Sequence, residues 1–413
     1  MKKNYLFGML ALAAMTMVGC SNDEVVNDYS QDNAIQFGTY VGRGASSRAH
    51  VIDTKTLGTE GFGVFAYYTE KDDFDASKHT PDFMYNQLVK NNSNWTENKG
   101  FAGDWSYDPL KYWPNNVDDK VTFLAYAPYN AATTIEALSG DDVNNTSIKY
   151  SVSNINLADQ KDLLYLCQTK DDSSAESCST INLTKQSVTD KVEFHFLHAL
   201  SRIGFKAELM VDEINVDDTG EEDDNLSDDG QTPAKNGDLD DNTVVTIQEI
   251  VLIGKFYNEG ILNLNGGVWT ATAPTEDYNF TLKGDDLENT VFKGNSNKDD
   301  NTDVEIRQVN TDESYLMIIP QLFEGFSKND ETTFGKGIKI RVKYEVKTTD
   351  ADNDKNSSTI VNEITSDEFN IEFEQGKAYS FNLHLGLTSV KLSAEVQEWG
   401  DETEIAVNVP INF

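Results

Sequence analysis

Short segments of alternating or continuous apolar residues recur along the chain and are separated by clusters of Asn, Asp, Gly and Ser. Such segments are typical of strands buried on one or both faces. Helical periodicity is scarce and is suggested only at residues 134–138 and 282–292. With no strand–helix–strand rhythm, the pattern predicts antiparallel sandwiches. The predicted strands cover residues 34–41, 61–68, 120–126, 192–197, 203–209, 244–253, 315–319, 338–346, 369–373, 378–385 and 390–396.

The order of the predicted strands divides the chain between residues 185 and 191, just before a second run of strands begins. This division predicts an N-terminal β-sandwich domain over residues 49–188 and a C-terminal one over 189–413. Residues 212–242 contain almost no apolar side chains, and we expect them to form a solvated acidic insertion at a hairpin tip. A calcium site is the alternative for this insertion, but the fixed spacing of an EF-hand loop is missing.

The first 26 residues, MKKNYLFGMLALAAMTMVGCSNDEVV, carry two lysines and then an apolar stretch. The stretch is too short for a membrane span of roughly 20 residues and has the size of a secretory leader. Residues 17–20, MVGC, resemble a bacterial lipobox, which predicts a signal peptide over 1–19, acylation of Cys20 and a lipid-tethered mature chain. An ordinary signal peptide with an incidental cysteine is the alternative.

The charge balance narrows the range of partners. The 413 residues carry a formal net charge of -37, from 70 acidic and 33 basic side chains. Such a field repels phosphate backbones and anionic headgroups, so we expect no nucleic-acid ligand. Aromatic residues make up 10% of the chain, enough to build a sizeable core.

The two cysteines beyond Cys20 flank a polar loop, QTKDDSSAES. If the segments on either side pair as a hairpin, Cys167 and Cys178 face each other and can form a disulfide in an oxidising compartment. Free thiols are the equal alternative.

The sequence contains little that predicts catalysis. None of the metalloprotease, serine-hydrolase or phosphate-loop motifs occurs. His195 and His198 could suggest a metal dyad, but three residues apart in a strand they lie on opposite faces, with Phe194 and Phe196 pointing inward. We therefore predict no enzyme, no cofactor and no metal site.

Several stretches taken together carry a family resemblance. They are the leader, AIQFGTYVGRGASSRA, GFGVFAYY, YDPLKYWPNNVDDKVTFLAYAPY, DLLYL, FHFLHALSRIGFKAEL, SYLMIIPQ and GKAYSFNLHLGLTSVKLSAEVQEW. In this order they resemble the fimbrillin family, the Mfa-like and FimA-like subunits of type V pili. The resemblance implies an all-β fold of two transthyretin-like antiparallel β-sandwich domains in tandem. It also implies a structural subunit, stalk or tip, of a fimbria.

Subunits similar to this one assemble by donor-strand exchange with other pilus subunits. The resemblance implies that residues 20–48 form a propeptide that includes the first strand, and that an arginine-specific protease cuts after Arg43 or Arg48. Removal of that strand would open an apolar groove that another subunit's strand fills. Both arginines are otherwise ordinary loop residues. The C-terminal tail alternates apolar residues like a donor strand, or like a last strand of its own domain: Ile405, Val407, Val409, Ile411 and Phe413.

The same resemblance implies a location and a competing role. The acidic residues behind Cys20 look like a signal for the outer face of the outer membrane, where the lipid anchor holds the precursor before it enters the fimbrium. The alternative function is a surface lipoprotein adhesin that binds a glycan or a host protein through the loop at residues 91–104. Its Trp95 and Phe101, with nearby Trp105, could stack on a sugar. Trp399 is expected to plug a sandwich end, with sugar stacking as the lesser alternative.

Overall fold

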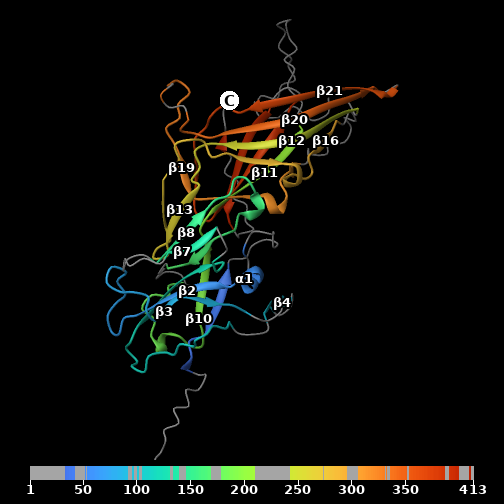
Figure 1. Ribbon diagram of the computed structural model, residues 1–413. Helices are drawn as coiled ribbons and strands as arrows, with labels where there is room; N and C mark the ends of the chain where they lie inside the picture. The colour runs from blue at the N-terminus through green and yellow to red at the C-terminus, as the bar shows by residue number, and fades with distance from the viewer. Residues whose placement is uncertain are drawn as a thin grey trace, which may run out of the picture.

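The regular structure is almost entirely β (Figure 1). This confirms the all-β prediction, whereas the transthyretin-like topology stays a prediction. The computed structural model describes residues 33–41, 52, 54–91, 95–96, 100–101, 105–130, 134–138, 146–168, 178–209, 242–272, 274–294, 306–330, 332, 335–350, 353–386, 390–399 and 409–410.

One sheet forms the lobe that contains the blue strands in Figure 1, and the green strand β10 lies with them. Phenylalanines on β1, β2, β6 and β10 fill one face of this sheet, together with Leu57 of the short helix α1 (Thr54–Glu60). The strand order is β1 (Phe37–Val41), β10 (Val192–His198), β9 (Leu164–Leu166), β6 (Val121–Ala127), β2 (Phe62–Tyr68) and β3 (Met84–Val89).

The remaining strands form further sheets and strand pairs. One of them has the strand order β17 (Arg307–Gln308), β11 (Ser201–Leu209), β23 (Lys377–Leu385), β24 (Val390–Glu398) and β25 (Val409–Pro410), and β18 (Leu316–Ile318) also pairs with β11. Another has the strand order β15 (Phe280–Lys283), β12 (Thr243–Ile253), β20 (Lys339–Asp350) and β21 (Asn353–Thr365), and β16 (Val291–Lys293) also pairs with β12. The others are β14 (Val268–Ala271), β13 (Glu259–Asn263), β8 (Ser147–Ser151) and β7 (Ile135–Leu138), then the pairs β19 (Gln321–Phe323) with β22 (Ile371–Phe373) and β4 (Trp95–Thr96) with β5 (Gly100–Phe101).

The sheets cross the expected division at residues 188/189, which itself stays a prediction. Strand β10 lies beyond that division but pairs with β1 and β9, and β8 lies before it but pairs with β13. A single hydrophobic cluster also extends from Phe65 and Tyr126 of the first sheet to Phe205 and Phe381 of the β11–β23 pair. Burial of apolar side chains therefore joins the two halves instead of separating them.

The helical prediction for residues 134–138 is wrong, and that for 282–292 is met only by one 3-10 turn, Gly284–Asp286. Residues 135–138 form β7, because the ladder to β8 pairs Ile135 with Tyr150 and buries Ile135. Residues 282–292 contain the end of β15, a single 3-10 turn and the start of β16, both strands being paired with β12. The helix α1 was not expected from its sequence, TKTLGTE, and its Leu57 is fully buried. Long-range pairing outweighs weak local preferences at residues 135–138 and in β15 and β16.

Candidate functional site

The segment 33–41 lies at the edge of the sheet that contains β10, and one face of the segment packs into the hydrophobic core. Ile35, Phe37 and Val41 are 1%, 1% and 2% exposed. The ring of Phe37 lies 4.9 Å from that of Phe194 and 5.5 Å from that of Tyr107, measured between centroids. The alternation that predicts a strand here therefore corresponds to a buried face.

Two different neighbours hold the backbone of this segment. On one side β1 runs parallel to β10, from Phe37 opposite Val192 to Val41 opposite Phe196. On the other side residues 33–35 form a short antiparallel contact with residues 111–113, in which Ile35 N donates to Lys111 O at 2.9 Å. We refer to the space between these two neighbours as the β1 slot.

Tyr107 closes the β1 slot on the side away from β10. Its hydroxyl donates a hydrogen bond of 2.7 Å to the carbonyl oxygen of Ile35. Burial raises the pKa of Tyr107 to about 12, so the phenol remains a donor at physiological pH. Sequence reasoning assigned neither Tyr107 nor Lys111 to this slot, although YDPLKYW carries aromatic residues on both sides of Lys111.

The opposite face of β1 is open to solvent at its outer end. Tyr40 is 47% exposed, and its ring lies 5.6 Å from that of His195. A Cβ atom at Gly38 would collide with the carboxylate of Glu193, so this position accepts little more than hydrogen unless Glu193 moves. Since β1 is the first strand in the sheet order, it has only β10 as a neighbour within the sheet.

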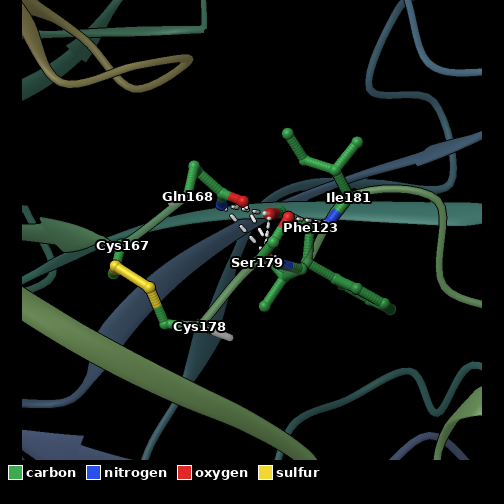
Figure 2. The surroundings of a disulfide bond; sticks show 7 residues. Phe123, Cys167, Gln168, Cys178, Ser179 and Ile181 are labelled. Carbon is green, nitrogen blue, oxygen red and sulfur yellow. Dashed lines mark hydrogen bonds between the residues drawn. A yellow bond between two sulfur atoms is a disulfide. The ribbon is translucent and has the colours of Figure 1, made fainter. Parts of the chain in front are cut away.

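A disulfide lies just after β9, which is on the side of β10 away from β1 (Figure 2). It joins Cys167, just after β9, to Cys178, with a Cα–Cα distance of 5.7 Å. The segment that follows Cys178 lies along β6, because Thr180 Oγ1 donates to Phe123 O at 2.6 Å and Phe123 N donates to Thr180 O at 3.0 Å. The disulfide therefore ties together backbone next to β10 without involving β1.

The C-terminal tail is described only at Val409 and Pro410. These two residues form β25, which pairs with Ala394 and Ser393 of β24 at the edge of another sheet. An edge position tolerates the missing N–H of proline. The other predicted donor residues, Ile405, Val407, Ile411 and Phe413, lie outside the described residues, as do Cys20, Arg43, Arg48 and residues 212–241 of the insertion.

The predicted faces of the two neighbouring histidines are confirmed. His195 is partly exposed, whereas His198 is 8% exposed and shares a 2.8 Å hydrogen bond with the buried carboxylate of Asp162. The backbone N–H of Ile52 donates to the same oxygen, Oδ2, at 3.0 Å. Within the described ranges no group of three His, Cys, Asp or Glu residues could hold a metal ion.

The tryptophans offered for sugar stacking have protein neighbours. Trp399 is 8% exposed, and its ring stacks on the His198 ring with 4.2 Å between centroids. It is therefore packed against protein, while its place at a sandwich end stays a prediction. The Trp105 ring lies 4.9 Å from that of Phe62 in the core of the first sheet. The side chains of Trp95 and Phe101 lie outside the described residues.

No helix in the described part of the chain is long and apolar enough to cross a membrane.

Comparisons with known proteins give the following relatives. The chain is 26% identical over 422 residues to the fimbrium subunit Fim1C of Phocaeicola vulgatus, covering 97% of this chain and 98% of that one. A solved structure of a Bacteroides uniformis protein, named for cell adhesion, is 14% identical, with a TM-score of 0.44 and coverage of 89% and 98%. The C-terminally truncated tip fimbrial protein Mfa3 of Porphyromonas gingivalis is 8% identical, with a TM-score of 0.37 and coverage of 87% and 99%. The profile of the fimbrillin-like family matches residues 47–399, which is most of the chain, and the protein therefore belongs to the fimbrillin-like family of fimbrial subunits.

Proposed function

We propose that this protein is a structural subunit of a type V fimbria that polymerises by exchanging the occupant of the β1 slot. In this scheme the precursor is exported as a lipoprotein acylated at Cys20, and an arginine-specific protease cuts after Arg43 or Arg48. Strand β1 then leaves, and the C-terminal tail of another subunit takes its place. The observation that carries the proposal is that β1 is an edge strand whose Phe37 and Val41 side chains are buried, and that GRGASSRAH follows it directly.

The energetics of the β1 slot favour replacement over an empty state. Ile35, Phe37 and Val41 are almost completely buried. Burial of each such side chain stabilises the fold by about 1.5–3 kcal/mol, so emptying the slot costs roughly 5–9 kcal/mol before backbone effects. It also leaves backbone groups of β10 and residues 111–113 without partners. An emptied slot therefore binds a second apolar strand strongly.

The C-terminal tail has the pattern such a strand needs. It places apolar residues at every second position from 405 to 413, as β1 and the residues before it do at 35, 37 and 41. The described contact of the tail with its own chain is a two-residue pairing on β24. Within the described residues, this pairing is what must break before the tail can bind elsewhere.

The lipid at Cys20 would hold the precursor at the outer membrane only until cleavage. Both candidate arginines lie between Cys20 and the body of the protein, so a cut after either one separates the lipid and β1 from the rest of the chain. The same cut would therefore release the subunit and open its slot.

The test uses the purified full chain incubated with an arginine-specific protease. The expected result is a new N-terminus at Gly44 or Ala49, followed by ladders of polymer on SDS gels. The variant Arg43→Lys with Arg48→Lys keeps both charges and should neither be cut nor form ladders. Ladders from this variant, or cleavage of the wild type without any polymer, would contradict the scheme.

A further inference from the structure

Three polar side chains from neighbouring strands meet on the outer face of the β11–β23–β24 sheet. Lys206 of β11 lies directly opposite Asn382 of β23 in the parallel pair, and Glu395 lies on β24, the next strand. Their sequence neighbours Phe205 and Phe381 are fully buried on the other face. The strand alternation thus holds an amine, a carboxamide and a carboxylate in fixed register.

The carboxylate of Glu395 bridges the other two groups. Lys206 Nζ donates to Oε2 at 3.2 Å, and Asn382 Nδ2 donates to Oε1 at 3.0 Å. Each carboxylate oxygen of Glu395 therefore accepts a hydrogen bond from one of the two nitrogens. This arrangement lets a single carboxyl group take a proton from the amine and deliver one to the amide nitrogen.

Burial separates this cluster from an ordinary surface ion pair. Asn382 is 5% exposed, and the side chains of Lys206 and Glu395 are 30% and 33% exposed. The carbonyl oxygen of Asn382 is buried and has no hydrogen-bond partner. A buried polar atom without a partner is rare and requires an explanation.

Glu395 has the protonation state that the first step needs. Partial burial works to raise the pKa of its carboxyl group, but the hydrogen bonds from Asn382 and Lys206 prevail and lower it. Glu395 is therefore ionised at neutral pH, and the geometry places one of its oxygens on each of the two nitrogens.

We propose that Lys206 and Asn382 become joined by an isopeptide bond, with Glu395 as the proton carrier. Glu395 takes a proton from the ammonium, and the neutral Nζ attacks Cγ of Asn382 to form the new C–N bond. Glu395 passes the proton to Nδ2, the bond from Cγ to Nδ2 breaks, and ammonia leaves. Nζ gives up two protons in all, one of which ends on ammonia while the other passes to solvent. No oxidant, reductant or further reactant is required.

The chain contains a matched cluster that should not react. Lys120 and Asn182 both donate to Asp73, but to the same oxygen, Oδ1, at 2.7 and 3.2 Å. The Asp73 side chain is 79% exposed, and the Asn182 carbonyl already accepts from Phe74 N at 2.7 Å. Because both nitrogens share one oxygen of an exposed carboxylate, this cluster lacks the bridge of two separate oxygens that Glu395 provides.

The consequence of the bond is a covalent link between two adjacent parallel strands, β11 and β23, which belong to distant parts of the sequence. It would close a loop that contains the whole stretch between them. Force applied along the chain would then have to pass through the link before it could separate these strands.

The test is mass spectrometry of the folded full chain after reduction of its disulfide. The expected intact mass is about 17 Da below that of the unlinked polypeptide, the mass of one ammonia. A tryptic digest should contain one branched peptide that joins Lys206 to Asn382, because trypsin does not cut after an acylated lysine. The variants Lys206→Arg, Asn382→Ala and Glu395→Gln should lack both signals, and Lys120→Arg should retain them.

Two results would overturn the proposal. One is recovery of linear peptides with unmodified Lys206 and Asn382 from the folded wild type, a measurement that does not depend on any variant folding. The other is an undiminished mass loss in Glu395→Gln, which would remove Glu395 from the reaction.

Discussion

The replacement Phe37→Ala tests how much of the precursor's stability depends on β1. Phe37 is 1% exposed and lies within 6.2 Å, between ring centroids, of Phe62, Tyr107, Phe123 and Phe194. Truncation of a buried phenylalanine to alanine costs about 3–5 kcal/mol, because both the transfer free energy and the packing around the cavity are lost. We expect the free energy of unfolding of the uncleaved chain to fall by that amount.

Urea denaturation followed by tryptophan fluorescence measures the effect. Trp105 and Trp113 pack against Phe62 and Phe123 of the same core, so their emission reports on this sheet. With a slope of roughly 2–3 kcal/mol per molar urea, the midpoint should fall by about 1–2 M.

The matched control is Tyr40→Ala in the same strand. Tyr40 is 47% exposed, so its truncation should change the free energy of unfolding by less than about 1 kcal/mol. Equal midpoints for Phe37→Ala and Tyr40→Ala would refute the account of β1 as a core strand.

The same variant also tests strand exchange. If β1 leaves the slot during assembly, polymers made from Phe37→Ala and from wild type should be equally stable, because neither retains residue 37. The cleaved variant should also form ladders faster, since its resident strand is held less tightly. If the Phe37→Ala polymer were less stable than the wild-type polymer by the same amount as the uncleaved chains differ, β1 would have stayed in place.

Three further changes probe the surroundings of the slot and the junction of the two halves. Joint replacement of Cys167 and Cys178 by serine should lower the free energy of unfolding by about 2–3 kcal/mol, since the disulfide closes a loop with a sequence separation of 11, and an unchanged melting temperature would contradict this. Asp162→Asn should cost about 1–3 kcal/mol in thermal unfolding, because Asp162 is fully buried and accepts hydrogen bonds from Ile52 N and His198; a loss within error of zero would be inconsistent with that role. Burial raises the pKa of Tyr107 to about 12, so its stabilising contribution is complete below pH 10, the usual pKa of tyrosine, and is lost as the pH rises through about 12. Unfolding curves of Tyr107→Phe should therefore depend less on pH than those of wild type between pH 10 and 12, and parallel curves would count against the assignment.

Strand positions were largely predictable because the alternation of apolar and polar residues follows directly from burial of one face of a strand. The pattern VEFHFLH predicted that Phe194 and Phe196 point inward and His195 outward, and the structure confirms it. The same reasoning found the buried face of residues 34–41. Each of these inferences needs only the period of a strand.

Pairing partners could not be predicted in the same way. Strand β1 pairs in parallel with β10, a strand more than a hundred residues away that the predicted division placed in the other domain. The second wall of the slot, residues 111–113, is likewise distant from β1 in the sequence. Periodicity shows which face of a strand is buried but not which strand lies beside it, so the walls of the site required the structure.

If subunits assemble by the proposed strand exchange, the parallel pairing of β1 with β10 also sets a direction for growth. A strand that reproduces the hydrogen bonds of β1 must run the same way along β10, so every incoming tail enters with one polarity. Contacts between identical copies are then head-to-tail, and an assembly of this kind has two unlike ends and no built-in stopping point. A subunit without a usable tail could bind to such an assembly only through its slot, and would end growth there.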